Sequence, residues 1–369
     1  MPKQVIFEAK DFQSLLDVLT AKKYINLGPT VRDDTIVYDR LWSASDLPIG
    51  RVDDQDGGRY RLVKEDRERF FAFIPGQDSW KKFLFPPEKV LFEVTKSGKG
   101  FKIDRPESDG DAMAFIGVRA CELKAIEIQD KILMGGPDAD AFYAERRKRS
   151  FIVAVNCVRA GGTCFCVSMN TGPRAAGGFD LALTEIFDSQ RHVFLAEIGS
   201  KEGGEVMSAV PHQPATEDDL GAAEQAIGKA ASQMGRRLNM ATIKESLERN
   251  FEHPHWQEIA MRCLACGNCT MVCPTCFCFN VSDVTDFSGE KAVRRRRWDS
   301  CFNADHSYIY GGNIRNSSYS RYRQWMMHKL AYWFDQFDSA GCVGCGRCIT
   351  WCPVGIDLTE EAAFFEKAK

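Results

Sequence analysis

Two short segments near the C-terminal end of the chain share one cysteine pattern. Residues 263–274 read CLACGNCTMVCP and residues 342–353 read CVGCGRCITWCP, so both follow C-x2-C-x2-C-x3-C-P and agree at six of twelve aligned positions. Thiolates spaced three residues apart can reach three corners of one iron–sulfur cube from a tight loop. Gly267 and Gly346 lie inside the runs, where a small residue lets the backbone fold around such a cube. The repeat therefore predicts two [4Fe–4S] clusters.

Other uses of clustered cysteines fit this repeat less well. A zinc ion takes four tetrahedral ligands and does not need this run twice, and buried free thiols do not explain a repeated spacing. The N-terminal segment MPKQVIFEAKDF carries Lys3, Glu8 and Lys10 and has no apolar run, so neither a secretory signal nor a disulfide framework is expected. The odd total of fifteen cysteines also argues against complete pairing.

The double run resembles the cluster-binding motifs of bacterial two-cluster ferredoxins, in which the fourth cysteine of each run ligates the other cluster. This resemblance implies a crossed assignment of ligands. One cluster would be held by Cys263, Cys266, Cys269 and Cys352, and the other by Cys342, Cys345, Cys348 and Cys273. A long insertion, residues 274–341, separates the two runs and has no counterpart in a simple ferredoxin.

Seven cysteines remain outside the two runs. They are Cys121, Cys157, Cys164, Cys166, Cys276, Cys278 and Cys301. One hypothesis is a third metal site, such as another iron–sulfur cluster, built from Cys157, Cys164 and Cys166 with one of Cys276, Cys278 or Cys301 as the fourth ligand. The alternatives are buried small apolar residues, a zinc site or a redox-active thiol pair. Cys121 begins an expected helix, where we expect it to pack, with a thiol of lowered pKa as the alternative.

Apolar patterning predicts an α+β protein. We expect a mixed α/β domain over residues 1–253 and a mainly helical, ferredoxin-like dicluster domain over residues 254–369. Helical periodicity or composition favours helices at 12–19, 122–133, 139–148, 216–249 and 322–337, and short apolar runs favour buried strands at 90–94, 114–118, 151–155 and 193–198. The strand–helix–strand order around residue 130 predicts some parallel pairing.

Charge and hydropathy exclude two classes of partner. Charged residues make up 27% of the chain and the net charge is −3, which leaves no basic face for nucleic acid. Residues 263–282 lack charges but contain polar residues and six cysteines, so they would make a poor membrane span. We therefore expect a cytoplasmic protein.

The remaining charged features receive no chemical role. The basic run 294–297 is expected to be a solvated or salt-bridged surface, with docking of an acidic partner, or a positive field near a cluster, as the alternatives. His253, His255, His306 and His328 lack metal-type spacing to one another and are assigned no site.

Longer strings carry a family resemblance. PTCFCFNVSDVTD, RRWDSCF, SRYRQWMMHKLAYWFDQF and GCVGCGRCITWCPVGID, together with GVRACELKAI and NCVRAGGTCFCVSMNTGP upstream, resemble the iron–sulfur β subunit of soluble, sulfhydrogenase-type [NiFe] hydrogenases. They also resemble the iron–sulfur relay subunit of anaerobic sulfite reductase. The likeness covers most of the chain from about residue 75.

The resemblance implies a non-catalytic electron-transfer subunit. Its partners would be a flavoprotein subunit linked to NAD(P)H and a catalytic subunit, most simply a cytoplasmic [NiFe] hydrogenase and alternatively a sulfite reductase. Neither a G-x-G-x-x-G motif after a strand nor a Walker-type loop occurs in the chain. A self-sufficient flavin-binding oxidoreductase and a module with purely structural clusters remain the other hypotheses.

Overall fold

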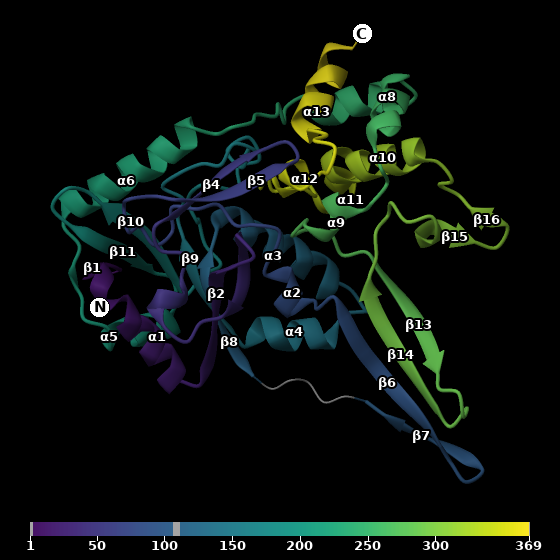
Figure 1. The fold of residues 1–369 in the computed structure, drawn as a ribbon, viewed down its shortest axis with the longest axis horizontal. Helices are drawn as coiled ribbons and strands as arrows, with labels where there is room; N and C mark the ends of the chain where they lie inside the picture. Colours follow the sequence, from purple (N-terminus) through teal and green to yellow (C-terminus); the bar gives the residue numbers. More distant parts are fainter. Residues whose placement is uncertain (1–2, 106–110, 369) are drawn as a thin grey trace.

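A mixed sheet of eight strands forms the centre of the computed structural model, which describes residues 3–105 and 111–368. The strand order is β12-β1-β11-β10-β9-β8-β2-β3 (Figure 1). The strands are β1 (Gln4–Glu8), β2 (Tyr24–Arg32), β3 (Thr35–Arg40), β8 (Ala112–Val118), β9 (Ser150–Val155), β10 (Leu181–Phe187), β11 (His192–Ile198) and β12 (Gln213–Pro214). β9 runs parallel to β8 and β10, and β2 runs parallel to β8, which confirms the expected parallel pairing.

The central strands are covered on both faces. Along β8, Ala114 and Ile116 face a core shared with α1 (Phe12–Ala21) and α5 (Lys201–Ser208), while Phe115 faces a core shared with three other helices. Those helices are α2 (Lys81–Leu84), α3 (Ala120–Leu133) and α4 (Ala141–Lys148). Because alternate side chains are buried on opposite faces, the strand reads as a continuous apolar run. The α+β class and the elements expected around α3 are confirmed.

A second sheet combines segments that are distant in the sequence. It contains β6 (Glu88–Ser97), β7 (Gly100–Asp104), β13 (Phe279–Thr285) and β14 (Lys291–Trp298) in the order β13-β14-β6-β7, and it projects from the body (Figure 1). The insertion between the cysteine runs therefore pairs with the N-terminal half of the chain. The expectation of a buried strand at 90–94 was wrong in one respect: β6 forms but is only half-buried, because it lies in this outer sheet.

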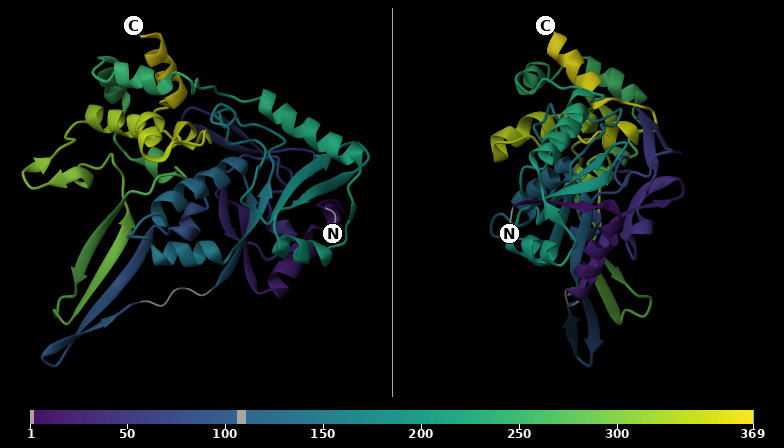
Figure 2. Two further views of the ribbon diagram at one scale, coloured as in Figure 1. Left: turned by 180° about the vertical axis from the view of Figure 1, so that it is seen from behind. Right: turned by 90° about the vertical axis from the view of Figure 1, so that its left-hand side faces the viewer.

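Short helices and turns make up most of the C-terminal part. They are α7 (Ile243–Arg249), α8 (His255–Arg262), α9 (Asn268–Met271), α10 (Ser318–Met327), the π-helical turn η4 (His328–Tyr332), α11 (Trp333–Phe337), α12 (Arg347–Thr350) and α13 (Leu358–Lys367). The expected helix over 322–337 is confirmed as α10, η4 and α11 in succession. Apolar side chains of these helices form a separate core, in which Trp256 stacks on Phe365 with ring centroids 4.2 Å apart. In both views of Figure 2 these helices lie near the top and the outer sheet points toward the bottom.

The expected helical segment 216–249 is interrupted. α6 (Glu217–Ser232) ends well before α7 begins, and residues 233–242 instead contact the loop around Gly162. A Cβ atom on Gly235 would lie 2.0 Å from the Gly162 carbonyl oxygen, so the two backbones touch directly. Arg236 then donates from Nε to Asp357 at 2.5 Å and from its backbone N–H to the Cys164 carbonyl at 3.0 Å. These contacts outweigh the local helical preference.

The remaining elements are small. They are the hairpins β4 (Arg51–Asp56) with β5 (Arg59–Lys64) and β15 (Tyr308–Ile309) with β16 (Gly312–Asn313), and the 3-10 turns η1 (Ala9–Asp11), η2 (Ala44–Asp46) and η3 (Asp305–Ser307). Within the described ranges, no helix has the length and apolarity needed to cross a bilayer. A domain boundary near residues 253–254 stays a prediction, and residues from both sides of it build the outer sheet.

Candidate metal centres

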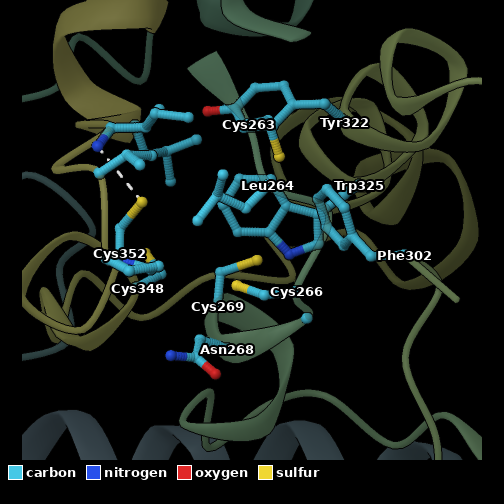
Figure 3. Close-up of a pocket in the computed structure, with 15 residues that line it drawn as sticks. Cys263, Leu264, Cys266, Asn268, Cys269, Phe302, Tyr322, Trp325, Cys348 and Cys352 are labelled. Carbon is cyan, nitrogen blue, oxygen red and sulfur yellow. Dashed lines mark hydrogen bonds between the residues drawn. The ribbon is translucent and has the colours of Figure 1, made fainter. Parts of the chain in front are cut away.

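The first cavity brings together cysteines from both runs. Cys263, Cys266 and Cys269 line it with Cys352, and Figure 3 shows their sulfur atoms facing a common space. Cys263 ends α8 and Cys269 lies in α9, while Cys352 follows α12. The apolar wall consists of Leu264, Phe302, Tyr322, Trp325, Val354, Ile356 and Leu358. The crossed set that the ferredoxin resemblance implied is therefore assembled in space, and its ligation of a cluster stays a prediction.

Backbone geometry in both runs favours thiolate sulfur. Gly267 and Gly346 adopt φ values of 77° and 75°, a left-handed conformation that glycine tolerates. The backbone N–H groups of Ala265, Gly344 and Ile356 point at the sulfur atoms of Cys263, Cys342 and Cys352 at 3.4, 3.4 and 3.3 Å. Such N–H···S contacts stabilise negative charge on cluster sulfurs.

The second set lies beside the first, and its four cysteines are only partly exposed. Burial raises the pKa of the Cys348 thiol well above its ordinary value, and the nearby charges of Cys342, Cys345 and Cys273 raise it further. These four are the other crossed set. Cys348 also lines the first cavity, so the two sets are neighbours. The side chain of Lys329, a residue 3% exposed, donates from Nζ to Cys273 Sγ at 3.3 Å and places a buried positive charge at this site.

A buried ion pair attaches the second set to helix α3. Arg347 lies between Cys345 and Cys348, and its Nη2 atom is 2.6 Å from Glu122 Oε1 in α3. Arg347 Nε also donates to the Gly76 carbonyl at 3.0 Å. Since the Arg347 and Glu122 side chains are only 4% and 1% exposed, the pair fixes the cysteine loop against the α/β part of the chain.

Comparison with known proteins assigns the family. The model of a 4Fe-4S dicluster domain matches residues 262–356. "Sulfhydrogenase 2 subunit beta" of Pyrococcus furiosus is 35% identical over 280 residues, which cover 75% of this chain and 79% of that protein. The chain belongs to the iron–sulfur β-subunit family. As a member of this family it is an iron–sulfur electron-transfer subunit, and the dicluster match confirms the expectation of [4Fe–4S] chemistry.

Four of the seven further cysteines of this β subunit line another cavity. Cys157, Cys164 and Cys166 are brought together as expected, but the fourth thiol is Cys121. The fourth ligand proposed from the sequence was Cys276, Cys278 or Cys301, and the structure places those three elsewhere. The reason is topological, because Cys121 and Cys157 follow the adjacent parallel strands β8 and β9 and so meet at one edge of the sheet.

Cys276, Cys278 and Cys301 line a cavity at the base of the β13–β14 hairpin. The hairpin ends are joined by a hydrogen bond from the Asp299 N–H to the Cys278 carbonyl at 2.9 Å. His306 and His328, which were assigned no site, also line this cavity. A hydrogen bond with Cys301 lowers the pKa of Cys278 to about 4, and one with Cys278 raises the pKa of His306 to about 9.

Spacing between histidines did not reveal His306, because the groups that it hydrogen-bonds are Cys278 and Asp299 and not another histidine. Its Nδ1 atom is 2.8 Å from Asp299 Oδ2. His253 and His255 lie apart from the cysteines, with His255 between Glu258 and Glu361. Over residues 3–105 and 111–368, no three histidine, cysteine or acidic side chains converge closely enough to hold a single metal ion.

The basic run 294–297 is salt-bridged, which confirms the first interpretation of it. Its four arginines pair with Asp283, Glu88, Asp140 and Glu88 in turn. The guanidinium of Arg296 is also buried against the Phe85 ring, 4.0 Å from its centroid. The positive charge of the run is therefore largely compensated within the chain.

Proposed function

We propose that this β subunit relays electrons through two [4Fe–4S] clusters, one held by Cys263, Cys266, Cys269 and Cys352 and the other by Cys342, Cys345, Cys348 and Cys273. The observation that carries the proposal is the presence of eight thiols in two neighbouring sets, each completed by the fourth cysteine of the other run. When bound, each cluster would accept and release one electron at a time.

The protein's own groups suit this task. Trp325, Tyr322 and Phe302 exclude water from the first cavity, and the N–H groups directed at sulfur favour the thiolate form. Lys329 adds positive charge at the second set, where added electrons would be stabilised. Both effects act on the reduction potential without any group of the chain reacting.

The first set is the better placed to exchange electrons with a partner. Cys266 is exposed, and the side chains of Leu264 and Met261 beside it are 63% and 81% exposed. Exposed apolar side chains around a redox centre are typical of a protein contact. The cysteines of the second set are all less exposed than Cys266. We infer that a partner subunit covers the surface around Cys266.

The family supports a proposal for the partners. The related Pyrococcus furiosus protein is by name a subunit of a sulfhydrogenase. This supports, as one partner, a catalytic hydrogenase subunit. The other would be a flavoprotein linked to NAD(P)H, and a sulfite reductase subunit is the alternative catalytic partner. We propose a cytoplasmic location, because fifteen unpaired cysteines require a reducing compartment.

The crossed assignment of cluster ligands can be tested by single substitutions. In anaerobically purified protein, Cys352→Ala should abolish the same EPR signal as Cys263→Ala, and Cys273→Ala the same signal as Cys345→Ala, each with a loss of about four irons. The control Leu264→Ala alters the first cavity without removing a thiol. An uncrossed pairing of signals would contradict the ligand assignment.

The relay itself is tested in the native complex. A complex that carries Cys263→Ala should lose hydrogen-dependent reduction of NAD(P), while hydrogen-dependent reduction of a viologen dye by the catalytic subunit persists. If both reactions survive, the chain is not on the electron path.

A further inference from the structure

Four thiols surround one enclosed space in the α/β part of the chain. Cys121 lies in the first turn of α3 and Cys157 follows β9, while Cys164 and Cys166 lie on the loop between β9 and β10. The loop is held in place by hydrogen bonds from Cys157 N–H to the Pro173 carbonyl at 3.1 Å and from Cys164 N–H to the Gly161 carbonyl at 3.2 Å. Three separate segments thus present four thiols to a single cavity.

This cavity resembles the first metal centre in size and lining. Its volume of about 30 Å³ equals that of the cavity lined by Cys263, Cys266, Cys269 and Cys352. Apolar groups of Ile74, Pro75, Ala160 and Met234 form much of the remaining wall. Both cavities therefore combine four cysteines, and a fifth from the second set, with apolar neighbours that exclude water.

The positive charge beside the cavity favours an anionic occupant. Arg119 is 2% exposed, lines the cavity and places Nη1 4.0 Å from Cys157 Sγ. Its Nη2 atom donates to the Phe71 and Phe73 carbonyls at 2.9 Å, but its Nε atom is buried without a hydrogen-bond partner. Among the residues that the structure describes, no carboxylate forms an ion pair with this guanidinium, so a buried charge faces the thiols uncompensated.

Two further arginines add to this field, but each already has an acidic partner. Arg159 pairs with Asp53 at 2.6 Å and Arg347 pairs with Glu122 at 2.6 Å. Neither of these pairs compensates the charge of Arg119. Four thiolates around a [4Fe–4S] core carry net negative charge and would do so.

The cavity also adjoins the second set of ferredoxin cysteines. Cys345 lines it, and Phe165, between Cys164 and Cys166, donates its N–H to the Gly344 carbonyl at 2.9 Å. Thr171 Oγ1 donates to the Val343 carbonyl at 2.6 Å. The loop that carries two of the four thiols is therefore packed directly on the loop of the second set.

We propose that Cys121, Cys157, Cys164 and Cys166 hold a third [4Fe–4S] cluster. It would extend the relay from the two ferredoxin clusters into the α/β part, taking one electron from the second cluster and passing it to a partner's acceptor. Its role as a relay rests on the proposed function, whereas its binding is tested independently. The arrangement would give about twelve irons per chain in place of eight.

Iron content of anaerobically purified, full-length protein tests the proposal. The double variant Cys157→Ala/Cys166→Ala should contain about four irons fewer than the wild type, and the EPR signals that depend on Cys263 and Cys345 should remain. The matched control is Met234→Leu, at a residue whose sulfur is 3.9 Å from Cys166 Sγ in the same cavity; it should keep all the iron. Retained EPR signals show that the double variant is folded.

The outcomes separate this proposal from the relay itself. If the double variant keeps all its iron while Cys263→Ala loses about four, the third cluster is refuted and the ferredoxin relay stands. If the double variant loses every signal, the milder variant Cys121→Ser decides: loss of about four irons alone supports the cluster, and full iron content overturns it.

Discussion

The carboxylate of Glu122 offers a sharp test of how the cysteine loops are held. It is 1% exposed and accepts hydrogen bonds from Tyr38 Oη at 2.9 Å, Trp80 Nε1 at 3.1 Å, the Arg119 N–H at 3.1 Å and Arg347 Nη2 at 2.6 Å. All four partners are donors. Glu122→Gln keeps the shape of the side chain but turns one acceptor oxygen into an NH2 donor that faces other donors.

The expected cost is large because the loss is one-sided. Arg347 would keep its buried charge without a counter-ion, and breaking a buried pair in this way costs about 3–5 kcal/mol. With a urea m-value of about 3 kcal/mol/M for a large chain, the unfolding midpoint should fall by about 1–2 M. The loss applies whether or not a metal group is bound, since the pair joins protein groups only.

Urea unfolding followed by circular dichroism under anaerobic conditions measures this shift. The matched control is Glu127→Gln on the same helix, where the carboxylate pairs with Lys124 at 2.7 Å and both side chains are more than 40% exposed. The control should cost no more than about 0.5 kcal/mol. If Glu122→Gln shifts the midpoint no further than the control, the ion pair does not anchor the cysteine loop.

Three further perturbations have definite expected outcomes. Lys329→Met removes an ammonium 3.3 Å from a sulfur of the second set. With the added electron about 6 Å from this ammonium and a dielectric constant of about 20, the attraction that is lost is ~3 kcal/mol. An EPR-monitored titration should therefore show a reduction potential lower by about 120 mV, and an unchanged value would contradict the placement of Lys329. The hydrogen bond with Cys278 raises the pKa of His306 to about 9, so the stabilisation from its protonated form is complete below about pH 6.5 and is lost as the pH rises through 9. The difference in urea midpoint between wild type and His306→Gln should therefore shrink over that interval. A constant difference would refute the role of protonated His306. Gly346→Ala places a Cβ atom 2.4 Å from a backbone oxygen at φ +75°, whereas the Cβ atom of Gly289→Ala at φ +70° meets nothing within 4 Å. In thermal unfolding, the first variant should lose iron and more than about 3 kcal/mol of stability, and the second only about 1 kcal/mol. Equal losses would count against close packing of the Gly346 loop.

The part of the site that depends on local spacing could be predicted from the sequence. A cysteine every three residues has meaning within one loop, so the eight ferredoxin cysteines could be proposed as ligands without the fold. The strands at β8 and β9 were also found, since a strand covered on both faces leaves an apolar run. In each case the signal lies within about twelve contiguous residues.

Features that depend on distant pairing could not be read in the same way. Cys121 joins Cys157 only because β8 and β9 are neighbouring parallel strands. The expected strand–helix–strand order contained this signal, since residues that follow parallel neighbours meet at one edge of the sheet. The pairing of β14 with β6, by contrast, has no local signature, because the register between segments so far apart is set by the whole fold.

The shared outer sheet has a consequence for how the protein is made. β6 is complete at Ser97, but its second neighbour, β14, begins only at Lys291. At translation rates of roughly 5–20 residues per second, the free edge of β6 waits roughly 10–40 s for its partner, a period in which unpaired strand edges invite aggregation. Residues 343–344, whose carbonyl groups hold the loop around the cavity of Cys157, are synthesised later still. A nascent chain therefore needs protection of the β6 edge until synthesis has passed residue 298, and the cavity of Cys157 is not completed before residue 344 has been made.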